Sequence, residues 1–239
     1  MTDEKTTAPP APKGFGYYLG SDLLGLVFSW IPTLFCWTCG VQWFWHFWSP
    51  GPRVLCLLTP FMALLGLFFI QFLFRMLLPR LKRGVYPATP NKMLISWWSQ
   101  VLMARSLDMT GMRNLVMATG FLRFLYFRSL GAKISYKTSI SLNVSMVDFP
   151  LISVEDEAFI GEGTTILCHS MVNDRFMLKK VEIKKNAFVG GSCTIGMGTV
   201  LKENSYLGFR NILYNHTVEA GEKVPDFEYD RGPKRSHEA

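Results

Sequence analysis

Charged residues and cysteines are both scarce in this sequence. Only 18% of the 239 residues are charged, whereas 49% are hydrophobic and 19 are phenylalanine. This composition is more apolar than a soluble domain of this size needs, so a membrane segment is expected. The five cysteines have no framework spacing, which gives no sign of an oxidising compartment. Cys36 and Cys39 form a Cys-x-x-Cys pair in an apolar run flanked by tryptophan, so we interpret them as packing residues and expect no metal.

A nucleic-acid-binding signature is missing as well. The net charge of +7 suits an anionic partner, but no basic helix interleaved with base-stacking aromatic residues is present. Several of the positive residues instead flank the apolar segments. We therefore expect the lipid bilayer, with its anionic headgroups, to be the partner of this charge, and we expect no nucleic acid.

Two long stretches without charge dominate the N-terminal part of the chain. The first extends from Leu23 to Trp48 and the second from Val54 to Phe74. Each is long enough to cross a bilayer as a helix, which takes about 20 residues. Because a short turn separates them, residues 20–83 are predicted to form a transmembrane helical hairpin. Residues 1–19 are polar and proline-rich and lack the apolar core of a signal peptide, so a disordered tail is expected there.

The C-terminal half of the chain contains a repeat of six residues. An aliphatic side chain returns at this spacing in two runs, the second one residue out of phase: Val154, Ile160, Ile166 and Val172, then Ile183, Val189, Ile195, Leu201 and Leu207. A period of six fits neither a helix nor a simple alternating strand, but it fits a coil of short parallel strands stacked turn on turn. With weaker register at Ile134 and Ile140, the coil is predicted over residues 130–209. A polar tail is predicted over residues 210–239.

The segment between the hairpin and the coil, residues 84–129, mixes apolar side chains with isolated arginines and is too interrupted to span a membrane. Two arrangements suit this pattern. The segment forms either amphipathic helices at the membrane surface, with guanidinium groups reaching lipid phosphates, or helices that cover the coil by ordinary packing. Either arrangement sets the coil close to the bilayer.

The distribution of basic residues predicts the orientation in the membrane. Four of them follow the second apolar stretch at once: Arg75, Arg80, Lys82 and Arg83. The turn between the two stretches offers only Arg53. Because short flanks rich in lysine and arginine stay in the cytoplasm, we expect an integral, multi-pass membrane protein whose two termini and coil are all cytoplasmic.

The interruption of the repeat is the expected place for chemistry, because the regular turns of a solenoid are scaffold and its insertions form loops on one face. It contains His169, Asp174 and Arg175. Four lysines follow: Lys179, Lys180, Lys184 and Lys185. A histidine that titrates near neutral pH can take the proton that a hydroxyl or amine loses when it attacks a thioester. Asp174 is a candidate to orient the imidazole, and the lysines are candidates to bind the phosphates of the donor.

The coil resembles that of the hexapeptide-repeat acyltransferases, which form left-handed β-helices and most often use acyl-CoA. A closer resemblance is to the membrane-embedded terminal module of ε-poly-lysine synthetase and its relatives. Four segments in the same order carry it: Gly84-Val85-Tyr86-Pro87, Trp97-Trp98, residues 124–134 and residues 168–177. The resemblance implies that His169 is the general base and that Asp174 and Arg175 support it.

The resemblance also has implications for assembly. Those modules carry three β-helix units and follow an adenylation and a carrier domain, whereas this chain has one unit and neither of those domains. Because β-helix acyltransferases usually build their active site in the cleft between two coils, the resemblance implies a homotrimer.

The predicted fold class is membrane α plus all-β, an N-terminal two-helix transmembrane hairpin followed by a left-handed parallel β-helix. Three functions remain open. The protein is a membrane-bound acyltransferase with an acyl-CoA or acyl-carrier donor, a membrane partner that forms amide bonds for a nonribosomal peptide synthetase, or a non-catalytic scaffold. A γ-class carbonic anhydrase is excluded because it needs three histidine ligands and His169 is the only histidine within the predicted coil, residues 130–209.

Overall fold

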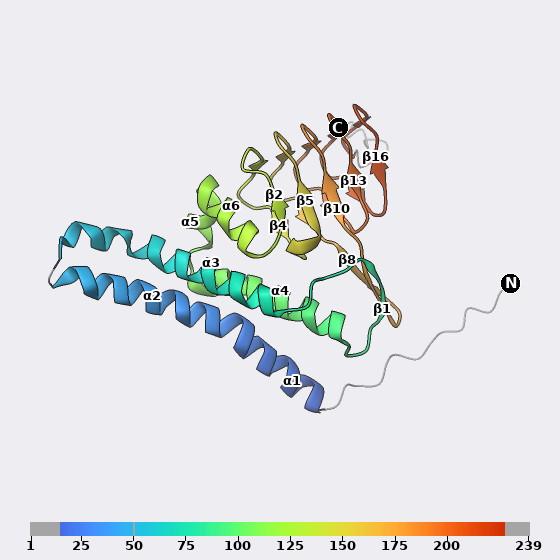
Figure 1. Ribbon diagram of the computed structural model, residues 1–239. Coiled ribbons are helices and arrows are strands. Elements are labelled where there is room, and N and C mark those ends of the chain that lie inside the picture. The colour runs from blue at the N-terminus through green and yellow to red at the C-terminus, as the bar shows by residue number, and fades with distance from the viewer. Residues whose placement is uncertain (1–14, 50, 228–239) are drawn as a thin grey trace, which may run out of the picture.

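A pair of long helices forms the N-terminal part of the protein. The computed structural model describes residues 15–49 and 51–227. The first helix is built from three continuous pieces: α1 (Phe15–Gly25), the π-helical turn η1 (Leu26–Trp30) and α2 (Ile31–Trp48). After a turn, η2 (Arg53–Leu58) and α3 (Thr59–Leu77) return alongside α2 (Figure 1). The predicted pair of long N-terminal helices is therefore confirmed.

Both helices are apolar over most of their surface. Leu19–Trp48 has a mean hydropathy of 1.6 and Arg53–Leu77 one of 2.2, and only 28% of each apolar window is buried. By length and composition, both are sufficient to cross a membrane. The first helix begins at Phe15, inside the segment predicted to be a tail. Residues 1–14 of that tail lie outside the described residues.

Three further helices lie between the hairpin and the β-structure (Figure 1). They are α4 (Lys92–Thr110), α5 (Arg113–Ala118) and α6 (Gly120–Ser129). The side chain of Asn91 caps the start of α4, which ends at Gly111 in the left-handed conformation. Large side chains of these helices are buried, among them Trp97, Leu102, Val116, Leu122 and Tyr126. Two arrangements were considered for residues 84–129. This burial is what the second one, helices that cover the coil, requires.

Buried hydrogen bonds fix these helices to the hairpin. The hydroxyl of Ser29 in η1 donates to the carbonyl of Leu102 in α4 at 2.8 Å. Gln71 in α3 bridges two helices, since its Nε2 donates to Oγ of Ser106 at 3.0 Å and its Oε1 accepts from Ser129 at 3.1 Å. Polar groups that are hydrogen-bonded to each other in apolar surroundings specify one arrangement of the helices. The hairpin and the coil are thus joined through α4 and α6.

Short parallel strands stack into three sheets of five, five and four strands. The first sheet contains β2 (Lys133–Ile134), β5 (Ile152–Val154), β10 (Val181–Ile183), β13 (Val200–Leu201) and β16 (Thr217–Val218). The second contains β3 (Ser139–Ile140), β6 (Phe159–Ile160), β11 (Phe188–Val189), β14 (Tyr206–Leu207) and β17 (Lys223–Val224). The third contains β4 (Ser145–Met146), β7 (Thr165–Ile166), β12 (Thr194–Ile195) and β15 (Ile212–Leu213).

The six-residue repeat sets the register of these sheets. In the second sheet, Ile140, Ile160, Val189 and Leu207 lie directly above one another. The repeat residues from Val154 to Ile166 and from Ile183 to Leu207 are no more than 1% exposed. Each buried aliphatic side chain stabilises the fold by about 1.5–3 kcal/mol. The predicted parallel β-helix is therefore confirmed.

The coil continues past Phe209, where the sequence pattern placed its end. β16 and β17 pair with β13 and β14 and carry the coil to Val224. Val218 follows Leu213 at a spacing of five positions instead of six, which interrupts the period in this part of the sequence. The predicted polar tail therefore begins later, and residues 228–239 lie outside the described residues.

A hairpin leaves the coil at the interruption of the repeat. Its strands are β8 (His169–Val172) and β9 (Arg175–Leu178), and β1 (Gly84–Pro87) pairs antiparallel with β9. The repeat predicted that Val172 points into the coil. That prediction is wrong, because Val172 lies on the hairpin and is 52% exposed. This small sheet brings the segment that follows α3 against the interruption.

Candidate active site

The centre of the candidate site is a buried carboxylate, Asp148. It follows β4, where the chain inserts the short helical turn η3 (Phe149–Leu151) before the next strand. Its backbone is left-handed, with φ 68° and ψ 42°, a conformation in which aspartate is enriched. The side chain is 0% exposed. A carboxylate taken out of water needs hydrogen-bond donors, and the donors to Asp148 define the site.

Three N–H groups converge on this carboxylate. Nδ1 of His169 lies 2.7 Å from Oδ2, and the backbone N–H of Cys168 donates to the same oxygen at 2.7 Å. The indole N–H of Trp97 donates to Oδ1. Because an ionised carboxylate only accepts hydrogen bonds, the proton of a neutral His169 lies on Nδ1. Nε2 then carries the lone pair that a general base needs.

Aromatic rings hold the imidazole in place. The rings of Trp97 and His169 have centroids 4.7 Å apart, and Phe176 of β9 lies 5.0 Å from Trp97. Trp97 comes from α4, so the helical layer supplies one wall of the site. His169 keeps 25% of its side chain exposed. The imidazole is thus oriented by protein on one side and accessible on the other.

The sequence analysis did not predict Asp148. It assigned the partner of His169 to the same segment of the chain, at Asp174. The backbone N–H of Val147 donates to the carbonyl of Ile166, so Asp148 lies one turn of the coil below Cys168. One signal points to it. Met146 continues the spacing of Ile134 and Ile140, but the next repeat residue, Val154, follows after eight residues.

Asp174 and Arg175 lie at the tip of the hairpin, away from the imidazole. In the register of this hairpin His169 pairs with Leu178, whereas Val172 pairs with Arg175. Three residues of strand separate these pairs by about 10 Å. Both Asp174 and Arg175 are exposed. Asp148 thus occupies the position beside Nδ1 that the sequence had assigned to Asp174.

The four lysines divide between two corners of the coil. Lys179 and Lys180 follow β9 at the corner that carries His169, and the backbone N–H of Lys179 donates to the carbonyl of Cys168 at 2.9 Å. Nζ of Lys179 donates to Oδ1 of Asn215 at 2.6 Å, toward the later turns.

Lys184 and Lys185 lie at the next corner, after β10. Lys184 forms ion pairs with Glu182 at 2.9 Å and Glu155 at 3.0 Å, and hydrogen bonds to these carboxylates raise the pKa of Lys184. Lys185 lies 3.9 Å from Glu157. Of the four lysines, only Lys179 and Lys180 therefore share the corner of His169.

The neighbouring thiol is not a nucleophile in this state. Cys168 is 0% exposed, and burial, followed by the charge of Asp148, raises its pKa well above the ordinary value. The thiol therefore stays protonated. Within the described ranges, 15–49 and 51–227, no three His, Cys, Asp or Glu side chains are grouped to hold a metal ion.

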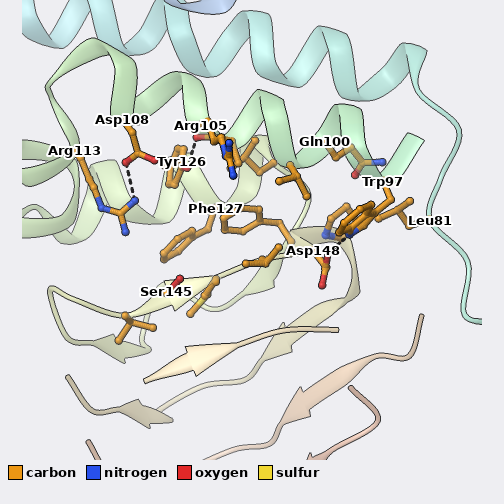
Figure 2. A pocket seen from close by; sticks show the side chains of 18 of the residues that line it. Leu81, Trp97, Gln100, Arg105, Asp108, Arg113, Tyr126, Phe127, Ser145 and Asp148 are labelled. Carbon is orange, nitrogen blue, oxygen red and sulfur yellow. Dashed lines mark hydrogen bonds and ion pairs between the residues drawn. The ribbon is translucent and has the colours of Figure 1, made fainter. Parts of the chain in front are cut away.

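A cavity of about 230 Å³ lies between α4, α6 and the first turns of the coil (Figure 2). Trp97, Gln100 and Asp148 line one end of it. The other end has Arg105 and the Asp108–Arg113 ion pair of 2.9 Å. Among the described residues, Oε1 of the buried Gln100, a lining residue of this cavity, has no hydrogen-bond partner.

The fold and the site define a hexapeptide-repeat β-helix protein in which a buried aspartate contacts a partly exposed histidine at one corner. No family model matches the chain. The chain is 27% identical over 135 residues to the delta-poly-L-ornithine synthetase of Acinetobacter baumannii (strain AB307-0294). This match covers 56% of the chain but only 10% of that protein. The predicted resemblance to poly-amino-acid synthetases is confirmed at this level.

Two solved structures have a similar arrangement at low identity. A maltose O-acetyltransferase from Clostridium difficile 630 is 13% identical with a TM-score of 0.47, covering 61% of this chain and 89% of that one. A hexapeptide-repeat-containing acetyltransferase from Vibrio cholerae O1 biovar eltor, in complex with acetyl coenzyme A, is 18% identical with a TM-score of 0.37. Its alignment covers 62% of this chain and 87% of that one.

Proposed function

We propose that this protein is a membrane-bound acyltransferase with a left-handed β-helix, in which His169 is the general base. The acyl group moves from acyl-CoA or a carrier-bound thioester to a hydroxyl or amine. The observation that carries the proposal is the contact between Nδ1 of His169 and the buried carboxylate of Asp148. Such a contact fixes the tautomer and stabilises the imidazolium that forms when Nε2 takes a proton.

The reaction needs no covalent intermediate on the protein. The acceptor oxygen or nitrogen attacks the thioester carbonyl while Nε2 of His169 removes its proton. The new C–O or C–N bond forms, the C–S bond breaks, and the imidazolium returns the proton to the departing thiolate. The cavity beside Trp97 suits part of a substrate with an O–H or N–H group, because Oε1 of Gln100 can accept its hydrogen bond.

A second candidate is the coupling of aminoacyl or peptidyl groups delivered by a separate synthetase. The match to the poly-ornithine synthetase, which spans a tenth of that protein, favours it. Lipid and soluble metabolites compared with and without the gene separate the two. An acylated small molecule or lipid that disappears supports the first candidate, whereas a lost peptide or polyamide supports the second. If neither the lipid nor the metabolite profile changes, the result supports the non-catalytic scaffold.

The donor's phosphates are expected to contact Lys179. Lys179→Ala should raise the KM for the donor about 5- to 30-fold, because a charge-assisted hydrogen bond of about 1–2 kcal/mol is lost, while kcat changes little. Lys184→Ala is the matched control, since Lys184 is already paired with Glu182 and Glu155. Steady-state kinetics with varied donor concentration measure both. Equal KM values for Lys179→Ala and Lys184→Ala would contradict this assignment.

The two apolar helices are proposed to cross the bilayer with both termini in the cytoplasm. The basic residues that follow α3, compared with the single Arg53 in the turn, favour this orientation. A reporter that is active only in the cytoplasm should be active when fused after Ala239. Activity there of a reporter that works only on the opposite side of the membrane would rule this topology out.

The assembly is proposed to be a homotrimer, because the resemblance places the site in the cleft between two coils. The exposed quarter of the His169 side chain leaves room for a contribution from a neighbouring coil. The protein mass of the detergent-solubilised particle, corrected for detergent by light scattering, should be three times the 27.2 kDa of one chain. A particle of one chain that retains activity would exclude the trimer.

A further inference from the structure

A groove of about 530 Å³ lies between α3 and α6. Much of its lining is apolar: Leu65, Phe68, Phe69 and Phe72 of α3 and Leu125 of α6. The same lining carries three cationic side chains, Arg75 of α3, Arg128 of α6 and Lys133 of β2. Phe69 and Phe72 are 57% and 41% exposed on the outer surface of α3. The groove thus joins an open apolar surface to a cluster of positive charge.

Among the described residues, the positive charges in this groove form no direct ion pair, although the pKa of Glu182 is lowered by a hydrogen bond from Lys184 and also by the charge of Lys133. None of the residues that line it is acidic. Arg128 and Lys133 also face a neighbouring depression that contains Glu155 and Asp156, but those carboxylates pair with Lys184 and Lys137. Through residues 15–49 and 51–227, neither Arg75, Arg128 nor Lys133 forms an ion pair within 4.0 Å.

Arg75 is held in position although its charge is not compensated. A Cβ atom on Gly131 would lie 2.9 Å from Nη1 of Arg75, so the guanidinium packs closely against this glycine. The guanidinium carbon lies 5.3 Å from the ring centroid of Phe72. Among the described residues, the buried Nε of Arg75 has no hydrogen-bond partner. A buried N–H without an acceptor raises the free energy of the folded state. This arrangement therefore favours an anion in the groove.

We propose that this groove binds one anionic phospholipid, with its phosphate against Arg75, Arg128 and Lys133 and an acyl chain along Phe69 and Phe72. Arg75 lies in the last turn of α3, the depth at which headgroups meet a spanning helix. The bound lipid would link α3 to α6, which contacts the first strand of the coil (Figure 1). The proposal rests on the membrane placement of α3 but not on acyl transfer.

The test is native mass spectrometry of the full chain, purified in detergent and stripped of lipid. Phosphatidylglycerol should bind with one molecule per chain, and phosphatidylcholine, whose headgroup is neutral overall, should bind at least about 10-fold more weakly. Arg128→Gln and Lys133→Gln should each weaken phosphatidylglycerol binding about 5- to 10-fold. Lys223→Gln, which removes an exposed charge at the far end of the coil, should leave binding unchanged.

Inorganic phosphate and coenzyme A identify other sources of the anion. If either competes with phosphatidylglycerol at equal concentration, the site recognises a free phosphate and the proposal fails. It also fails if the two lipids bind equally or if Arg128→Gln behaves like Lys223→Gln. Arg128 is exposed, so its replacement is not expected to unfold the protein, and a thermal melt checks this. His169→Ala should bind lipid normally, which separates this site from the proposed reaction.

Discussion

The His169→Ala variant is expected to turn over about 10²- to 10⁴-fold more slowly than the unchanged protein, the range for loss of a positioned general base. Without the imidazole, no group described at this corner carries a lone pair held by a buried carboxylate. The KM for the donor should change little, because the donor's phosphates are assigned to Lys179. Steady-state kinetics of the purified variant measure both quantities.

The fold should survive this substitution. His169 lies on a hairpin outside the coil and is partly exposed, so truncation removes little core volume. His216, exposed at the same corner two turns later, supplies the matched control, and His216→Ala should retain full turnover. Near-normal turnover of His169→Ala with an unchanged thermal melt would refute the mechanism and favour the scaffold interpretation.

Asp148→Asn is expected to lower turnover by about 10²- to 10⁴-fold as well, for a different reason. Asparagine has the shape of aspartate but presents an amide N–H₂ group in place of one carboxylate oxygen. An amide that donates to Nδ1 moves the imidazole proton to Nε2 and removes the base. The effect should fall on kcat, because Asp148 positions His169 and does not contact the donor.

A second measurement separates this positioning role from a purely structural one. Asp148→Asn leaves one of the donors Trp97 and Cys168 poorly satisfied, so the free energy of unfolding should fall by about 1–3 kcal/mol. The chemical shifts of the ring nitrogens of His169 report the tautomer, which a structural defect alone does not change. Asp174→Asn, the same chemical change at the hairpin tip, is the control and should be nearly neutral. A large loss in Asp174→Asn with full activity in Asp148→Asn would reverse the assignment.

The sequence alone determined the elements that repeat or persist along the chain. A six-residue period of aliphatic side chains is a burial pattern that each turn enforces separately, because every turn must fill the same cross-section. It therefore predicted the parallel coil and the buried positions from Val154 to Leu207, apart from Val172. Two long uncharged stretches predicted the pair of helices in the same way, because helix length and hydropathy are properties of one continuous segment. His169 stood out because it interrupts such a pattern.

The tertiary structure alone decided which residues meet at the site. Asp148 contacts His169 from one coil turn below. Its place in that turn depends on the extra residues inserted after Met146. Trp97 arrives from a helix whose docking is fixed by the hairpin and the coil together. Separations of this kind follow from the packing of distant segments and leave no period in the sequence. Asp174 and Arg175 are close to His169 in the sequence, five and six positions after it. They nevertheless lie at the hairpin tip, because strand β8 runs from His169 out to the tip.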